Sequence, residues 1–267
     1  MTDRRDAVLA EIGIQPIWRL RAQTPAREAA PGKPLQPVAA QTPVIPVHTG
    51  KLLEEPSGAS LSTMRPSKAS SVQEALGWEA LEESVRGCTA CGLCQARKQT
   101  VFGVGDRQAD WLLVGEGPGA EEDERGEPFV GQAGKLLDAM LGSIGLTRGE
   151  DVYIANAVKC RPPGNRTPEA SEIAACTPFL ERQIALIQPR LIVALGRPAA
   201  QSLLNAEIKI GAARGRLFDR QGIPVIVTYH PAYLLRNLED KAKSWEDLCF
   251  AQDQMQRLKA GARGDAA

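Results

Sequence analysis

Cysteines carry the clearest chemical signature in this sequence. Six of them are unevenly spread over 267 residues, and three form a Cys-x2-Cys-x2-Cys run in GCTACGLCQ. A set this small and uneven is no disulfide scaffold, and in a reducing compartment it indicates metal binding or catalysis. The spacing alone permits zinc, although the later pair is not a close Cys-x2-Cys knuckle. The candidate ligands are Cys88, Cys91, Cys94, Cys160 and Cys176.

A second candidate site is the segment GEGPGAEEDERGEPFVGQAG, residues 115–134. Its glycines let the backbone approach a ligand closely. Four consecutive acidic residues, at 121–124, argue against a phosphate-binding loop, and no Walker lysine follows them. Within this segment Phe129 is either a core residue or an aromatic plate for a planar ligand.

His230 is one of two histidines and stands in the segment YHPAYLLRN. A lone histidine is usually structural, but here a proline-stiffened turn follows, with two leucines that we expect to be exposed and an arginine. Proteins that unstack a DNA duplex insert apolar side chains of this kind between base steps, beside a cation. The segment therefore predicts a DNA contact by Leu234, Leu235 and Arg236.

Short apolar runs alternate with amphipathic segments and position these residues. Strands are expected at 110–117, 152–158, 190–196 and 223–230, and helices at 72–85, 133–146, 168–188, 198–205 and 241–259. The alternation predicts a three-layer α/β/α fold with a mainly parallel, four-stranded central sheet. Ligands of such folds bind beyond the carboxyl ends of the strands, where Glu116, Asn156 and His230 lie.

The first 73 residues differ in composition from the rest. Residues 22–73 hold eight of the nineteen prolines and no Phe, Trp or Tyr, which predicts a disordered linker. Residues 1–21 form an amphipathic island that we interpret as a docking peptide; the alternative is a helix that packs on the folded body. The folded domain is expected over 74–260, followed by a flexible tail over 261–267.

Charge excludes one mode of nucleic-acid binding. With 32 basic and 32 acidic residues the chain cannot bind DNA as a polybasic protein does, so a DNA contact requires a local basic patch. No apolar run approaches the ~20 residues of a membrane helix, and we identify no secretory signal. We expect a cytoplasmic, nucleoid-associated monomer.

Three motifs together resemble the family 4 uracil-DNA glycosylases, the iron–sulfur branch of that superfamily. They are GEGPG…EDERGEPFVGQAG, ANAVKCRPP and HPAYLL, in the family's order, and the likeness runs from about Gly87 to Leu258. The resemblance implies a DNA repair enzyme that flips uracil out of DNA and hydrolyses its N-glycosidic bond. It also implies a [4Fe–4S] cluster on Cys88, Cys91, Cys160 and Cys176. Cys94 then lies nearby and unligated, and Cys91 with Cys94 is the alternative first pair.

The resemblance also assigns roles in the pocket. Phe129 would stack on uracil, and the carboxamide of Asn156 would pair with its N3–H and O4, a pattern that cytosine reverses. His230 would donate to uracil O2 as the leaving base gains charge. Glu116 is the candidate to orient water or to stabilise the sugar cation, with Asp123 and Asn165 as lesser candidates. Gly117, also expected at the base, stands where the family 1 enzymes have an aspartate.

DNA contacts are expected from basic residues near the pocket and the cysteines. They are Arg86, Arg97, Lys98, Lys159, Arg161, Arg166, Arg214, Arg216 and Arg236. Each phosphate contact would steepen the salt dependence of binding. The alternative for some of these side chains is that they belong to a solvated face of the protein and do not contact DNA.

Three other assignments are alternatives to family 4. A covalently trapping branch of the superfamily has a KRRIH-like loop where this chain reads GAARGRLF, at 211–218, so cross-linking to DNA is not expected. Family 5 enzymes vary the first motif. An inactive DNA- or polymerase-associated iron–sulfur protein is the non-enzyme alternative. Separately, residues 1–21 resemble the N-terminal peptide of the psi accessory subunit of the bacterial clamp loader, which implies a clamp-loader subunit as partner.

Overall fold

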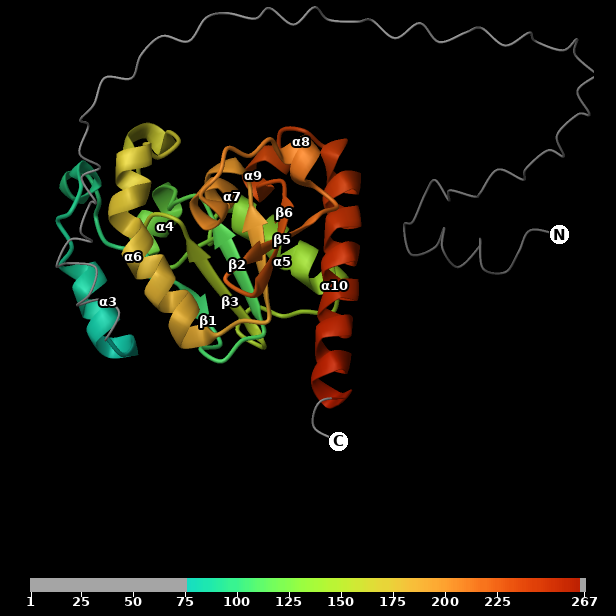
Figure 1. The fold of residues 1–267 in the computed structure, drawn as a ribbon. Coiled ribbons are helices and arrows are strands. Elements are labelled where there is room, and N and C mark those ends of the chain that lie inside the picture. Colours follow the sequence, from blue (N-terminus) through green and yellow to red (C-terminus); the bar gives the residue numbers. More distant parts are fainter. Residues whose placement is uncertain (1–75, 265–267) are drawn as a thin grey trace, which may run out of the picture. The chain divides into compact units, whose positions relative to one another are not determined.

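The computed structural model describes residues 76–264 and the burial of their side chains through residue 261. Within this part of the chain, strands form one six-stranded sheet in the order β1-β3-β2-β4-β6-β5 (Figure 1). The central strands pair in parallel: β2 (Trp111–Gly115), β3 (Val152–Asn156), β4 (Leu191–Leu195) and β6 (Ile223–Thr228). Short antiparallel strands flank them: β1 (Val104–Gly105) and β5 (Leu217–Arg220).

The expected four-stranded sheet is thus the parallel centre of a larger one. The sequence missed β1 because two residues give no period, and it missed β5 because LFDR alternates exposed and half-buried positions. Three central strands, β2, β3 and β4, are buried along their whole length, which explains why their apolar runs were recognised.

Helices cover both faces of this sheet, so the predicted three-layer architecture is confirmed (Figure 1). On one face, α6 (Ala170–Ile187) and α7 (Arg197–Leu204) pack against Leu112 and Val114. On the other face, α5 (Gln132–Ser143) and α10 (Asp240–Gly264) pack against Trp111 and Leu113. Successive side chains of β2 therefore enter opposite cores, as the period of two of a strand requires.

Shorter helices connect these layers. They are α3 (Trp78–Arg86), α4 (Ala120–Arg125), α8 (Ile210–Ala213), α9 (Pro231–Leu234) and the 3₁₀ turns η1 (Gly92–Gln95) and η2 (Pro163–Asn165). The sequence predicted α3 but none of the others, because a helix of one turn has no room for an amphipathic period.

Several expected helix ends differ from the structure. The helix expected over 72–85 begins at Trp78, and the helix expected over 133–146 ends at Ser143. The helix expected from 168 begins at Ala170, because the backbone N–H of Glu169 donates to the carboxylate of Glu172 and so forms the N-cap two residues later. The last helix continues to Gly264, beyond the expected end at 259 and into the expected tail. Residues 1–21 and 22–73, and with them the predicted peptide and linker, lie outside the described residues.

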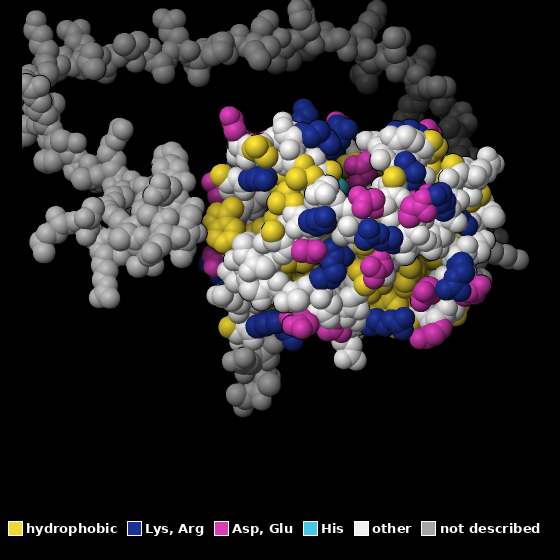
Figure 2. Space-filling view, turned by 180° about the vertical axis from the view of Figure 1, so that it is seen from behind, with side chains coloured by type: hydrophobic (Ala, Val, Ile, Leu, Met, Phe, Trp, Pro, Cys, Tyr) yellow, Lys and Arg dark blue, Asp and Glu magenta, His cyan; other side chains and the backbone are white. Residues whose placement is uncertain are grey.

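The surface of the domain mixes charges of both signs. Figure 2 shows Lys and Arg side chains interspersed with Asp and Glu over one face, with no single-sign field on it. Any basic DNA contact on this face is therefore local. None of the helices within residues 76–264 has the length and apolar character to cross a membrane.

Candidate active site

A cavity of about 720 Å³ opens at the carboxyl ends of the parallel strands. The last residues of β2 and β3 are paired, Gly115 with Asn156, and His230 stands two residues after the end of β6. The wall of the cavity includes all five residues predicted to bind the base: Glu116, Gly117, Phe129, Asn156 and His230. The topology thus brings together residues that lie more than a hundred positions apart in the sequence.

Phe129 and His230 face each other across one side of this cavity. Their ring centroids lie 5.4 Å apart with an angle of 28° between the planes. Phe129 is buried and has a φ of 55°, a left-handed conformation that costs a non-glycine residue on the order of 1–2 kcal/mol. Surrounding contacts must therefore hold this residue in place.

Glu122, on α4, supplies one set of these contacts. Its Oε1 accepts hydrogen bonds from the backbone N–H groups of Val130 at 2.9 Å and Gly131 at 3.0 Å. Its Oε2 accepts from the N–H of Gly119 at 3.1 Å. One carboxylate therefore ties the glycine-rich turn after β2 to the loop that carries Phe129. The acidic run has a structural use, which its composition did not reveal.

Gly115 keeps the cavity narrow at the end where Asn156 and Phe129 lie. A Cβ atom there would lie 2.4 Å from Oδ1 of Asn156 and 2.6 Å from Cζ of Phe129. The side chains of Asn156 and Phe129 can approach each other here only because residue 115 has no side chain. Residue 115 is glycine for this packing rather than for its backbone angles.

Asn156 presents an open acceptor to this end of the cavity. The residue is 2% exposed, and its Oδ1 is a buried atom without a hydrogen-bond partner among the described residues. A buried acceptor left unpaired costs about 1–3 kcal/mol. A ligand that brings an N–H donor to this atom recovers that cost, so the site fits a planar ligand with a ring N–H.

His230 is held as a neutral hydrogen-bond donor. Burial, and then the positive charge of Arg236, lower its pKa to about 4. Its Nδ1 accepts a hydrogen bond from the backbone N–H of Ala232 at 3.1 Å. The single proton of the neutral ring is therefore on Nε2, and the donor that remains for a ligand is uncharged.

Glu116 and Gly117 also line the cavity. Burial raises the pKa of Glu116, whereas a hydrogen bond from Thr167 and the charge of Arg197 act in the other direction. A Cβ atom at Gly117 would lie 2.7 Å from Cγ2 of Val158. An aspartate at position 117 would therefore press against the buried side chain of Val158. Of the two carboxylates that line the cavity, Glu122 is bound to backbone N–H groups, and Glu116 is the other.

The lesser candidates for the carboxylate role have other partners. Oδ1 of Asp123 is buried and accepts from the backbone N–H groups of Lys98 at 2.9 Å and Gln99 at 3.4 Å. Asn165 does line the cavity, but its Oδ1 accepts from Nε of Arg161 at 2.7 Å. Asp123 is thus a structural residue, and it is not among the residues that line the cavity.

The HPAYLL segment forms α9 at the mouth of the cavity. Of the two leucines, Leu234 is 1% exposed and packs in the core, so our expectation that both are exposed is wrong for this residue. The reason is that α9 turns one side toward the sheet. Leu235 is 41% exposed and remains available to a partner.

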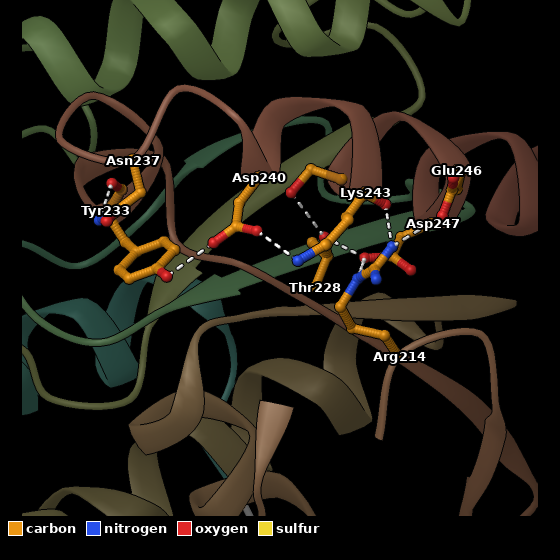
Figure 3. Close-up of polar contacts among 9 residues, drawn as sticks. Arg214, Thr228, Tyr233, Asn237, Asp240, Lys243, Glu246 and Asp247 are labelled. Atoms are coloured by element: carbon orange, nitrogen blue, oxygen red, sulfur yellow. Dashed lines mark hydrogen bonds and ion pairs between the residues drawn. The ribbon is translucent and has the colours of Figure 1, made fainter. Parts of the chain in front are cut away.

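Figure 3 shows how α9 and the end of β6 are fixed to α10. The hydroxyl of Tyr233 donates to Asp240 at 2.7 Å, and the ring of Tyr233 stacks on that of Tyr229 with centroids 5.0 Å apart. Thr228 donates to the buried carboxylate of Asp247 at 2.7 Å. Side chains of one helix therefore hold the residues before and after His230.

Several expected DNA contacts are engaged within the protein. Arg214 pairs with Asp247 at 2.7 Å (Figure 3). It also lies over the ring of Tyr229. Arg166 forms two hydrogen bonds to the carboxylate of Glu172, at 2.8 and 2.6 Å. The expectation for Lys159 is wrong, because its side chain is 1% exposed and donates to Asn156 O and Gln183 Oε1.

Other cations remain at the cavity or on the surface. Arg166 and Arg236 line the cavity together with Arg197, which the sequence analysis missed. Its position directly after β4, at the start of α7, was the signal available in the sequence. Arg216 lies over the ring of Phe218, 6.0 Å from its centroid, and is not among the residues that line the cavity.

Four of the cysteines gather in one apolar cluster. Cys160 and Cys176 are buried in it beside Leu93 and Phe179, and Cys88 and Cys91 pack against it. The charge of one thiolate affects the next: Cys88 and Cys91 both raise the pKa of Cys160, after burial, which is the larger cause. Cys94 is partly exposed and does not belong to this cluster within the described residues.

This arrangement fits an iron–sulfur cluster better than a single ion. Within residues 76–264, no three His, Cys, Asp or Glu side chains converge closely enough to hold one metal ion. A four-iron cluster is larger, so its sulfur ligands stand further apart. Hydrogen bonds from Arg97 Nη1 to Cys160 Sγ, at 3.0 Å, and from Lys159 N to Cys176 Sγ, at 3.5 Å, suit thiolate ligands.

Comparison with known proteins gives a consistent result. Residues 102–249 match the family described as the Uracil DNA glycosylase superfamily. The chain is 43% identical over 179 residues to a type-4 uracil-DNA glycosylase of Pyrobaculum aerophilum, covering 64% of this chain and 90% of the relative. It is 48% identical over 167 residues to a type-4 uracil-DNA glycosylase of Thermotoga maritima, covering 62% and 86%.

A type-5 relative is more distant. The type-5 uracil-DNA glycosylase of Pyrobaculum aerophilum is 35% identical over 146 residues, covering 49% of this chain and 64% of the relative. The same organism's type-4 protein matches over more residues and at higher identity. The likeness therefore favours type 4, in agreement with the PFVG and GEGPG motifs.

Proposed function

This chain belongs to the uracil-DNA glycosylase superfamily, and we propose that it is a DNA repair glycosylase of the type-4 branch. It would flip uracil out of DNA and hydrolyse the bond between uracil N1 and the sugar C1′, which leaves an abasic site. The observation that carries this proposal is the open acceptor of Asn156 between Phe129 and the backbone of Gly115. An acceptor in that place fits the N3–H of uracil.

Base selection follows from the carboxamide. Oδ1 of Asn156 accepts from uracil N3–H, and Nδ2 donates to uracil O4. Cytosine has an acceptor at N3 and a donor at its 4-amino group, so it would leave both atoms of the amide unpaired in a buried site. Sites of this kind discriminate strongly because the mismatch strands polar groups on both partners.

Bond cleavage then needs two further groups. As the C1′–N1 bond breaks, negative charge grows on uracil O2, and the Nε2–H of neutral His230 stabilises it by donation. Glu116 lies on the sugar side, where its carboxylate orients the water that adds to C1′ and stabilises the positive charge on the sugar. Water supplies hydroxide to C1′ and a proton to the departing base.

The cysteines extend the proposal to a cofactor. Cys88, Cys91, Cys160 and Cys176 would hold one [4Fe–4S] cluster, which supplies a structural cross-link and no step of the hydrolysis. The thiols join the loop after α3 to the connection after β3 and to α6. Because Asn156 and Cys160 are four residues apart, the cross-link lies directly beside the base-reading residue.

DNA would be held by cations around the mouth of the cavity. Arg197, which precedes His230 in the sequence, and Arg236, which follows it, both line the cavity. Arg161, Arg166 and Arg216 would add phosphate contacts at the periphery, and the salt dependence of binding would report their number. Arg214 would support DNA binding through its contact with Tyr229, which lines the cavity.

A direct test uses uracil-containing and matched cytosine-containing oligonucleotides with purified protein. We expect excision of uracil without added metal or nucleotide. Asn156→Asp should lower the ratio of uracil to cytosine excision about a hundredfold or more, since a carboxylate accepts from the cytosine amino group but cannot donate to uracil O4. Gln183→Glu, a matched change of amide to carboxylate outside the cavity, should leave that ratio unchanged in whatever protein folds.

The inactive alternative gives a different result in the same assay. An iron–sulfur protein that only binds DNA would retain affinity for uracil-containing strands but would not release free uracil. Absence of released uracil from brown, iron-loaded wild-type protein would therefore overturn the proposed activity. A colourless protein that contains zinc would overturn the proposed iron–sulfur cluster.

The partner proposal concerns residues 1–21, which lie outside the described residues. Their amphipathic pattern, with Trp18, and their resemblance to the psi peptide support docking on a clamp-loader subunit near chromosomal DNA. A linker of about fifty residues has a mean reach of ~35–45 Å, which would raise the local enzyme concentration without changing the site. A binding assay with the isolated peptide and clamp-loader subunits tests this; absence of affinity would refute it.

A further inference from the structure

Phe129 is strained, and α4 alone does not account for its position. The Glu122 carboxylate holds the N–H groups that follow Phe129, at Val130 and Gly131. The carbonyl groups of Pro128 and Phe129 point elsewhere and need separate partners. Those partners decide the tilt of the aromatic ring, because the φ and ψ angles of Phe129 are set by the two peptide groups on either side of it.

Arg148 supplies the partners of both carbonyls. It stands in the turn after α5, where Thr147 and Glu150 form a bridge. Its Nη1 donates to Pro128 O at 2.9 Å, and its Nη2 donates to Phe129 O at 2.8 Å. A guanidinium presents two parallel donors in a fixed plane, so it can hold two successive carbonyls in one relative orientation.

Two neighbours fix the guanidinium and the carbonyl that it binds. Nε of Arg148 donates to Oδ1 of Asp138, on α5, at 2.9 Å. Phe129 O also lies against the bare backbone of Gly134, where a Cβ atom would come within 1.7 Å of it. Because Arg148 and Gly134 both contact this carbonyl, rotation about the peptide after Phe129 is blocked.

We propose that Arg148, which touches neither base nor sugar, is a positioning residue that holds Phe129 in its left-handed conformation and thereby sets the stacking of the base. This inference rests on the proposed function, because the ring of Phe129 matters only if a planar base stacks on it. Without the two hydrogen bonds, Phe129 would relax toward a negative φ and its ring would leave the plane that faces the cavity.

The experiment measures base binding separately from stability. Free uracil is the probe, as a competitive inhibitor of excision. In Arg148→Met we expect its inhibition constant and the KM for DNA to rise about tenfold, a loss of the size expected when charged hydrogen bonds to a strained segment are removed. The single-turnover rate at saturating enzyme should change less than threefold, since His230, Asn156 and Glu116 stay in place.

Matched variants separate positioning from general destabilisation. Arg190→Met removes another arginine–carboxylate pair, with Asp110 at 2.9 Å and away from the cavity, and should leave uracil inhibition unchanged. Arg148→Lys keeps the charge beside Asp138 but loses the fork, so it should show a large part of the defect. It also keeps the test decisive if Arg148→Met does not fold.

A double-mutant cycle tests whether Arg148 acts through Phe129. In a Phe129→Ala protein, Arg148→Met should have no further effect on the uracil inhibition constant. Additive effects, or equal inhibition of wild type and Arg148→Met, would overturn the positioning role. Failure of the proposed function is a separate result, because the wild-type protein would then neither release uracil from DNA nor be inhibited by it.

Discussion

The base pocket and the four-thiol region share the segment from Asn156 to Cys160 but are supported in opposite ways. In the pocket, polar contacts of the chain itself hold Phe129 and His230 in place. Glu122 and Arg148 hold the backbone around Phe129, and the N–H of Ala232 holds His230. In the thiol region, apolar packing dominates, and the polar contacts to sulfur come from single donors such as Arg97.

This difference separates preorganisation from cross-linking. The pocket is arranged for its ligand before the ligand arrives, and Oδ1 of Asn156 and Nε2–H of His230 remain available to it. In the proposed function, the loops of the thiol region would depend for their cohesion on a cluster bound by several thiols at once. Damage to the pocket should therefore reduce catalysis at little cost in stability, and damage to the thiol region should do the reverse.

The largest expected effect comes from the thiol region. Replacement of Cys88, Cys91, Cys160 or Cys176 by Ala should lower iron content and soluble yield together, because ligand binding is coupled to folding. Iron per protein, absorbance near ~400 nm and melting temperature provide the measurements. The excision rate per iron-loaded molecule should remain that of the wild type, which the comparison of the two regions requires.

Cys94→Ala is the internal control for that series. This cysteine lies outside the apolar cluster, so the variant should keep full iron. Iron loss in Cys94→Ala together with iron retention in Cys88→Ala would show that the alternative pair, Cys91 with Cys94, is the correct one.

The next largest effect belongs to the pocket. His230→Ala should lower the single-turnover rate of excision ~10²–10³-fold, the scale for loss of one donor to a transition-state charge. Its melting temperature at pH 8 should fall far less than its rate, because the described contacts that the His230 ring loses are one hydrogen bond from Ala232 and the stacking on Phe129. An unchanged rate would remove His230 from the proposed mechanism.

Acid stability gives a third, intermediate effect. The pKa of His230 is about 4 in the folded protein, below the ordinary value of 6.5. Above pH 6.5 the ring is neutral in both states; as the pH falls toward 4, the unfolded state takes up its proton first. Folding therefore loses on the order of 3 kcal/mol across this window, and the loss is complete below pH 4.

His230→Asn isolates this contribution. The amide oxygen can still accept from Ala232, but it does not titrate. Unfolding by denaturant at pH 7 and pH 4.5 should show a smaller acid-induced loss in the variant than in the wild type. Equal losses in the two proteins would mean that the ring is protonated normally in the folded state.

The sequence predicted the parallel strands and the convergence at their ends because both follow from long apolar runs and from topology. The five residues that motifs and resemblance assigned to the base all line one cavity, but the sequence did not show what holds them. Glu122 was one member of an acidic run and Arg148 was not singled out, because backbone atoms are their partners. Contacts between a side chain and a distant carbonyl leave no pattern in composition or period.

Burial of single side chains was the other gap. Lys159 follows a strand and precedes a cysteine, a position that suggests a phosphate contact, yet its ammonium group donates a hydrogen bond to Gln183 of α6 in the core. Leu234 and Leu235 are identical in type, and only the turn of α9 decides which one is buried. Such outcomes depend on partners that are far away in the sequence.

The smallest expected effect tests α9, where the pocket meets DNA. Leu235 is exposed beside the cavity mouth, and a duplex must be unstacked before uracil can enter, whereas a single strand need not be. Leu235→Ala should therefore slow excision from double-stranded substrates about tenfold and from single-stranded substrates far less. Leu238→Ala, which truncates another exposed leucine, is the matched control. Equal losses on both substrates would show that Leu235 contributes to pocket structure rather than to strand separation, and α9 would then belong wholly to the preorganised pocket.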